Sequence, residues 1–164
     1  MCIRDRGAKK KQVRLDLKTA SEAVRNILTK SGAIVVDGDD LCSLPKAIKS
    51  APEISGSRAA HVRDGAALTS FLSWLSRTTK HSTVTEMSAA SMLYEFRKKD
   101  PNFRGLSFET ISGSGPNGAI VHYRVTPETD RSLSAGDIYL VDSGAQYLDG
   151  TTDVTRTVYI EHTN

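Results

Sequence analysis

The sequence predicts an α+β protein in which helices come first and antiparallel strands follow. Two long stretches before residue 100 repeat apolar residues at helical spacing. From Leu106 onward, short β-branched runs alternate with glycine-rich turns. Helices followed by a run of strands are typical of α+β domains, whereas regular alternation would indicate a parallel sheet.

The first fifty residues predict a small unit of their own. Apolar residues at helical spacing in LKTASEAVRNILTKSG predict a helix that Gly32 ends. The β-branched run AIVVD, residues 33–37, is typical of a buried strand. We therefore predict a small α/β unit over residues 15–50 and a new domain over residues 51–164. Residues 1–14, which open with MCIRDR, are expected to be a non-native or disordered start.

Two helices are predicted at the start of the second domain. The first runs from about Glu53 to Arg77 and carries an apolar stripe. The second runs from about Thr83 to Lys99, and the pair Thr83 and Glu86 matches a capping box at its start.

The last third of the chain predicts strands and turns. FETISGSGPNGAIVHYRV indicates a strand, a glycine-rich turn and a second strand that contains His122. IYLVDSGAQYLDGTTDVTRTVYI indicates two further strands, and Asp149-Gly150 is a strong hairpin signal between them.

Charge and composition exclude several kinds of partner. The net charge is only +3, and the basic residues are scattered apart from the run GAKKKQVR, so we expect no nucleic acid partner. No apolar run is long enough to span a bilayer, so we expect no membrane partner. Cys2 and Cys42 do not make a disulfide framework and suit a reducing compartment.

Three aspartates stand out in the last hairpin, because strands disfavour Asp and buried carboxylates need partners. With a two- or four-residue loop, the alternation of strand side chains places Asp142 and Asp153 on one face. Asp149 falls in the turn, where Asp is common for backbone reasons. Two carboxylates on one face repel unless a basic side chain, a shared proton or a metal ion lies between them, and a bulge is also possible. A site of oxygen ligands without cysteine favours Mn²⁺, Mg²⁺ or Co²⁺.

His122 is the other polar residue in a predicted apolar strand. A lone histidine there is either a satisfied structural residue or a catalytic one. The glycine-rich turn before it lacks the Lys-Ser/Thr pair of a P-loop, and no helix follows, so nucleotide binding is not expected.

LSFETISGSGPNGAIVHY followed by LVDSGAQYLDGTTDVTRTV closely resembles the cytosolic Xaa-Pro aminopeptidases, which belong to the pita-bread metallopeptidases. The resemblance extends over IKSAPEISGSRAAHVRDGAALTSFLSWL and VTEMSAASMLYEFR. It implies that residues 15–50 are the C-terminal part of the middle α/β domain and that residues 51–164 form the N-terminal half of a pita-bread catalytic domain. It also implies a cytoplasmic location and a homodimeric parent protein.

The resemblance also implies a site and a reaction. In that family two Asp, one His and two Glu hold two divalent ions. Asp142 and Asp153 match the two Asp ligands, the second of which bridges the ions, and His122 matches the histidine that hydrogen-bonds the substrate. The implied ions are manganese, with zinc or cobalt as alternatives. The implied reaction is release of the first residue from a peptide with proline second, by a water that two metals activate.

The remaining His and Glu ligands of the family would lie beyond Asn164. We therefore expect this chain to be a fragment that is inactive by itself. Two alternatives stay open. One is a non-catalytic pita-bread module that binds proteins, and the other is a prolidase-type Xaa-Pro dipeptidase.

Overall fold

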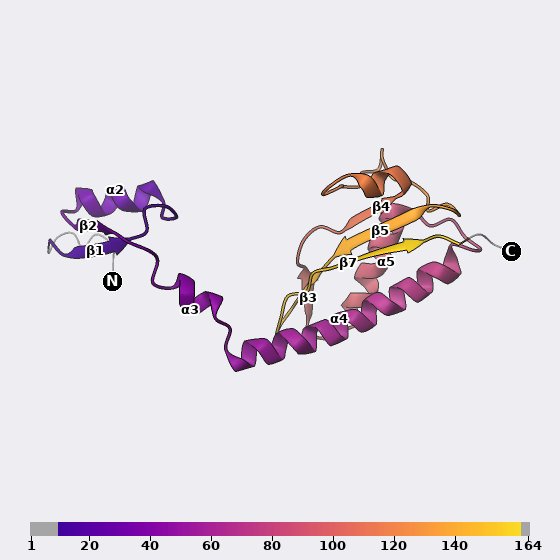
Figure 1. The fold of residues 1–164 in the computed structure, drawn as a ribbon, viewed down its shortest axis with the longest axis horizontal. Coiled ribbons are helices and arrows are strands. Elements are labelled where there is room, and N and C mark those ends of the chain that lie inside the picture. The colour runs from indigo at the N-terminus through magenta and orange to yellow at the C-terminus, as the bar shows by residue number, and fades with distance from the viewer. Residues whose placement is uncertain (1–9, 162–164) are drawn as a thin grey trace. The chain divides into compact units, whose positions relative to one another are not determined.

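The computed structural model describes residues 10–161, which form two compact units (Figure 1). The first unit ends at Lys49 and the second begins at Ser50. The expected non-native or disordered start at residues 1–14 therefore lies largely outside the described residues.

The first unit is a small βαβ arrangement. Strands β1 (Gln12–Leu15) and β2 (Ile34–Asp37) pair in parallel, and helix α2 (Glu22–Lys30) connects them. The predicted helix and the predicted strand at residues 33–37 are thus confirmed. The expected burial of that strand is wrong, because Ile34 and Val36 are 52% and 42% exposed. The expectation of a disordered start is wrong for residues 12–14, because pairing with β2 satisfies the backbone of β1.

Gly32 ends α2 as its position predicts. It has a φ of +83°, a conformation that glycine adopts without a steric cost. The N–H groups of Gly32 and Ala33 each donate over 3.0 Å, to the carbonyls of Thr29 and Leu28. This is the Schellman pattern, which satisfies the last carbonyls of the helix. A short helix, α3 (Ser43–Ala47), follows β2.

The second unit begins with the two predicted helices. Helix α4 (Ala51–Thr78) has its N-cap at Ser50, whose backbone N–H donates to the Glu53 carboxylate over 2.7 Å. Helix α5 (Glu86–Lys98) begins three residues later than predicted.

The predicted capping box of α5 is wrong in its residues. The cap is Thr85, and its partner is Ser88, whose hydroxyl accepts from the Thr85 N–H over 2.8 Å. Glu86 does not return to Thr83, because its carboxylate is fully buried in a polar cluster described below.

Three antiparallel strands form the main sheet of the second unit, in the order β4-β5-β7. They are β4 (Ile111–Ser114), β5 (Ile138–Ser143) and β7 (Val154–Tyr159). After Ser143 the chain leaves this sheet, and β6 (Ala145–Tyr147) pairs instead with β3 (Phe103–Leu106). Helices and antiparallel strands together confirm the predicted α+β class.

One face of the main sheet carries the core. Tyr139 and Val141 of β5 are fully buried there, and they pack against apolar side chains of both helices. The helical members of this cluster that are themselves buried are Leu68, Phe71, Leu75, Ala89 and Leu93.

The predicted strand around His122 is wrong. Residues Gly115–Ala119 form a 3₁₀ helix, η1, and turns follow it. His122 has a φ of +54°, which a strand does not permit, and its side chain is exposed. Polar anchoring overrides strand propensity here, because the side chain of Asn117 and the N–H of Ser114 both donate hydrogen bonds to the Glu86 carboxylate.

None of the helices within residues 10–161 combines the length and apolar character that crossing a membrane requires.

Candidate metal centre

Asp142 lies near the end of β5, on the face of the sheet opposite the helical core. Strand alternation requires this placement, because its neighbours Val141 and Ser143 are both buried on the helix side. In the ladder Asp142 stands between Ile111 of β4 and Thr155 of β7. Its Oδ1 atom is buried and has no hydrogen-bond partner among the described residues. A buried carboxylate oxygen without a partner is costly, so this position favours a cation that residues 10–161 do not supply.

Asp153 directly precedes β7 and is exposed. The β5–β7 register pairs Ser143 with Val154, and continuing it by one step sets Asp153 opposite Gly144. Residues 142 and 144 share a face, so Asp142 and Asp153 also share a face, as strand alternation predicts. Arg156 lies on the opposite face from Asp153 by the same alternation and does not separate the two acids.

The chain between the two acids forms a projecting hairpin arm, residues 144–152. Its tip is a two-residue turn, closed by a 2.8 Å hydrogen bond from the Tyr147 N–H to the Gly150 carbonyl. Thr152 is buried in the arm, and its hydroxyl accepts from the Ala145 N–H over 3.0 Å. Gly144 admits no side chain, because a Cβ there would collide with the Thr152 carbonyl and the Ser107 hydroxyl. The arm therefore fixes how the residues before β7 meet the end of β5.

Asp149 lies at the tip of this arm, and its carboxylate accepts from Arg63 of α4. Arg63 also pairs with Asp100 over 2.8 Å. Asp149 thus has an ion-pair partner of its own and a position in the turn, which agrees with the interpretation of Asp149 as a turn former.

A buried ion pair holds the arm near its tip. Arg97 of α5 donates to both carboxylate oxygens of Asp64 of α4, over 2.7 and 3.0 Å. The Tyr147 hydroxyl of β6 donates to the same carboxylate over 2.8 Å. Burial raises the pKa of Tyr147, and the hydrogen bond to Asp64 raises it further. Both helices and β6 are therefore joined through one carboxylate.

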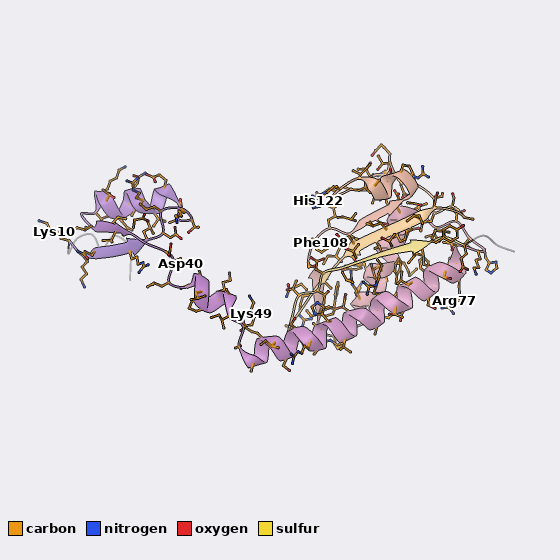
Figure 2. All side chains as sticks on the ribbon, in the orientation of Figure 1. Lys10, Asp40, Lys49, Arg77, Phe108 and His122 are labelled. Carbon is orange, nitrogen blue, oxygen red and sulfur yellow. The ribbon has the colours of Figure 1, made fainter. Side chains whose placement is uncertain are left out.

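His122 belongs to a segment that lies over the face of Asp142. Helix η1 contacts β4 and β5, and Gly118 approaches Gly113 and Leu140. Leu140 shares its face with Asp142. Figure 1 shows η1 on one side of the main sheet and α4 on the other. His122 follows η1, and its label in Figure 2 stands on that same side.

The carboxylates of Asp142 and Asp153 are ligands of the type that a hard divalent cation prefers, but two of them are too few to hold one. Both acids offer oxygen ligands, and the unpartnered Oδ1 of Asp142 suits a cation. Within residues 10–161, however, no three side chains of His, Cys, Asp or Glu gather closely enough to hold a metal ion. Two carboxylates are fewer ligands than such ions require, so other groups must complete the site.

The second unit matches a known protein family. The profile of metallopeptidase family M24 matches residues 55–164, which include α4 beyond its first turn, α5 and all strands of the second unit. The chain belongs to metallopeptidase family M24.

Relatives in the M24 family carry a consistent name. The Xaa-Pro aminopeptidase ApepP of Drosophila melanogaster is 52% identical over 120 residues, which are 73% of this chain and 19% of the relative. The chain thus spans about a fifth of the length of the curated relatives it matches.

Solved M24 structures confirm the fold. The X-prolyl aminopeptidase of Caenorhabditis elegans, described as a cytosolic enzyme with a di-nuclear active site, matches with a TM-score of 0.73 and 28% identity. That match covers 93% of this chain and 32% of the other. An Xaa-Pro dipeptidase from Bacillus anthracis gives a TM-score of 0.78 at 21% identity, over 99% of this chain and 45% of the other, and supports the shared fold alone. The predicted pita-bread fold is confirmed.

Sequence reasoning missed the buried polar groups of the second unit. Asp64 lies four residues before Leu68, and Arg97 lies four residues after Leu93, so both occupy the buried stripes of their helices. A charged residue at a core position of a helix was the signal that could have found them. No comparable signal identified Glu86, whose position at a helix start suggested a cap.

Proposed function

We propose that this chain is part of a metal-dependent aminopeptidase that releases the first residue from peptides with proline second. The observation that carries this proposal is the pair Asp142 and Asp153 on one face, with an unpartnered oxygen on Asp142. The 52% identity to a protein named Xaa-Pro aminopeptidase supports the substrate class. Because the chain spans 19% of that relative, the activity belongs to a longer parent protein and not to this chain alone.

Asp142 and Asp153 would hold two divalent ions, manganese before zinc or cobalt, together with ligands from the rest of the parent. When bound, such ions polarise the scissile carbonyl and lower the pKa of a water between them. Asp142 contributes from a rigid central strand, since β5 pairs on both sides. Asp153 would contribute from the point where the hairpin arm rejoins the sheet.

His122 would hydrogen-bond the substrate carbonyl oxygen. Its exposed side chain stands on the segment that covers the face of the two acids, so it can approach a peptide there without moving the sheet. A neutral or protonated imidazole donates through one ring N–H, which stabilises the charge that develops on that oxygen.

The remaining parts of the proposal follow from the same assignment. Residues 15–50 belong to the end of a preceding α/β domain, and residues 51–164 form the N-terminal half of the catalytic domain. The parent is cytoplasmic and homodimeric, and it binds neither nucleic acid nor membranes. No observation favours a non-catalytic binding module or a dipeptidase over the aminopeptidase.

Charge-neutral substitutions in the parent protein test the two ligands. D142N and D153N should each abolish measurable release of the first residue and reduce bound metal, determined by elemental analysis of the purified protein. D149N is the matched control on the same hairpin, and it should keep both metal and activity. Full metal content and activity in D142N would contradict the proposed site.

Substrate length separates the aminopeptidase from the dipeptidase. The parent should cleave longer Xaa-Pro peptides as well as Xaa-Pro dipeptides, whereas cleavage of dipeptides alone would indicate the dipeptidase. The 164-residue chain expressed by itself should release nothing in the presence of Mn²⁺, because its ligand set is incomplete.

A further inference from the structure

Glu86 is a fully buried carboxylate that pairs with no basic side chain among the described residues. Four groups satisfy it instead. Its Oε1 atom accepts from the Ser114 N–H over 2.6 Å and from the Asn117 side-chain amide over 3.1 Å. Its Oε2 atom accepts from the Tyr123 hydroxyl over 3.1 Å and from the Arg131 N–H over 3.2 Å. Every contact is a donor, which is the arrangement an ionised carboxylate requires.

The donors to Glu86 all come from one stretch of chain. Ser114 ends β4, Asn117 lies in η1, Tyr123 follows η1, and Arg131 closes the loop. The carboxylate therefore ties together the beginning, the middle and the end of residues 114–131. Residues 115–131 contain no strand or α-helix, so these bonds define their path.

His122 stands next to the most firmly anchored member of this stretch. The Tyr123 side chain is only 6% exposed. Its hydroxyl also accepts from Asn117 over 2.8 Å and lies 3.0 Å from the Thr129 hydroxyl. Burial raises the pKa of Tyr123, so the hydroxyl stays a donor. His122 itself holds a left-handed backbone conformation with φ +54°, which non-glycine residues adopt only when their surroundings impose it.

We propose that Glu86 is the positioning residue for His122. The inference rests on the proposed function, in which His122 contacts the substrate. Glu86 touches no reacting atom. It fixes the chain on both sides of His122 through Tyr123 and Asn117, and thereby holds the segment that carries the imidazole over the face of Asp142. A displacement of about 1 Å at a catalytic group can cost about a hundredfold in rate, so loss of this anchor should be visible in turnover.

A double-mutant cycle in the metal-loaded parent protein tests this role. H122A should lower kcat/KM by about 10²–10³-fold, the usual loss of one donor to a developing oxyanion. E86Q, which places an amide among four donors, should lower kcat/KM by about 10–10²-fold while metal content stays unchanged. The E86Q/H122A double variant should be no slower than H122A, because Glu86 acts only through His122.

Other results of the cycle would contradict either the positioning role of Glu86 or the substrate contact of His122. If H122A and E86Q multiply in the double variant, or if E86Q loses metal, Glu86 has a general structural role and the inference is wrong. If H122A leaves kcat/KM unchanged, the proposed contact of His122 with substrate fails, and the positioning of His122 fails with it.

A milder variant covers the case in which E86Q does not fold. Y123F removes only the hydroxyl that joins Tyr123 to Glu86, and it should show the same lack of additivity with H122A. Y94F is the matched control, because Tyr94 lies on α5 and packs against Phe103 away from this cluster. Hydrogen exchange of residues 115–129 should accelerate in Y123F and stay as in the unmodified protein in Y94F. Unchanged exchange together with full additivity would overturn the inference.

Discussion

Removing one charge from the buried Asp64–Arg97 ion pair should destabilise the second unit strongly, because the remaining charge is left buried without a charged partner. The Arg97 side chain is fully buried and that of Asp64 is 3% exposed. Either single substitution leaves the other charge in a position that water does not reach. The residual hydrogen bond from Tyr147 can satisfy only part of an isolated Asp64 carboxylate.

The expected magnitudes follow from this burial. R97M and D64N should each lower the free energy of unfolding by about 3–5 kcal/mol, the cost of leaving one partner of a buried ion pair uncompensated. The double variant D64N/R97M contains neither charge, and the new amide oxygen can still accept from Tyr147. Its decrease in the free energy of unfolding should be smaller than the sum of the two single decreases by about 2 kcal/mol or more.

Urea unfolding of the 164-residue chain measures these energies. Fluorescence follows Trp74, the single tryptophan, which packs against the core on α4. K98M is the control for a solvated ion pair, because Lys98 and Glu95 are 59% and 57% exposed and 3.7 Å apart. It should change the free energy of unfolding by at most about 0.5 kcal/mol. A loss below about 1 kcal/mol in R97M, or strict additivity in the double variant, would refute the reasoning.

Three further predictions concern the same chain. Burial raises the pKa of Tyr139 and Tyr147 above the ordinary value of 10.0, so their stabilisation is complete below pH 10 and is lost as the pH rises above it. The free energy of unfolding should fall there by about 1.4 kcal/mol per pH unit for each tyrosine, and Y139F should remove its part of the slope in urea titrations. G144A should cost about 1–3 kcal/mol through its collision with Thr152, whereas G65A, in open space on α4, should stabilise by about 0.4–1 kcal/mol in the same assay. With metal chelated, D142N should stabilise the chain by about 0.5–2 kcal/mol, because it removes the negative charge from a carboxylate whose buried Oδ1 has no partner, and a loss of stability would show that this charge is compensated in solution.

The sequence predicts well whatever depends on local periodicity or turn chemistry. Helix α4 follows from its apolar stripe, Gly32 ends α2 because of its backbone freedom, and the face shared by Asp142 and Asp153 follows from strand alternation. The assignment of those acids and of His122 to a metal site remains a prediction.

Tertiary hydrogen bonds decide what the sequence could not predict. Residues 119–125 have the composition of a strand. They form turns instead, because Glu86 at the start of α5 accepts hydrogen bonds from Tyr123 and from the nearby Asn117. Similarly, the N-cap of α5 is Thr85 and not Thr83, because the Glu86 carboxylate that suggested a capping box is buried elsewhere. Side chains that satisfy distant backbone groups leave no periodic pattern.

The hairpin arm between Asp142 and Asp153 limits how the length of this region can change. An insertion of one residue in either flank, beside Gly144 or Thr152, would shift the register by one and turn Asp153 toward the helical core. An insertion at the tip, between Leu148 and Asp149, would only lengthen the turn and leave both flanks paired. Among homologous chains, length variation in this region should therefore concentrate at the tip, and the two flanks should keep a constant number of residues.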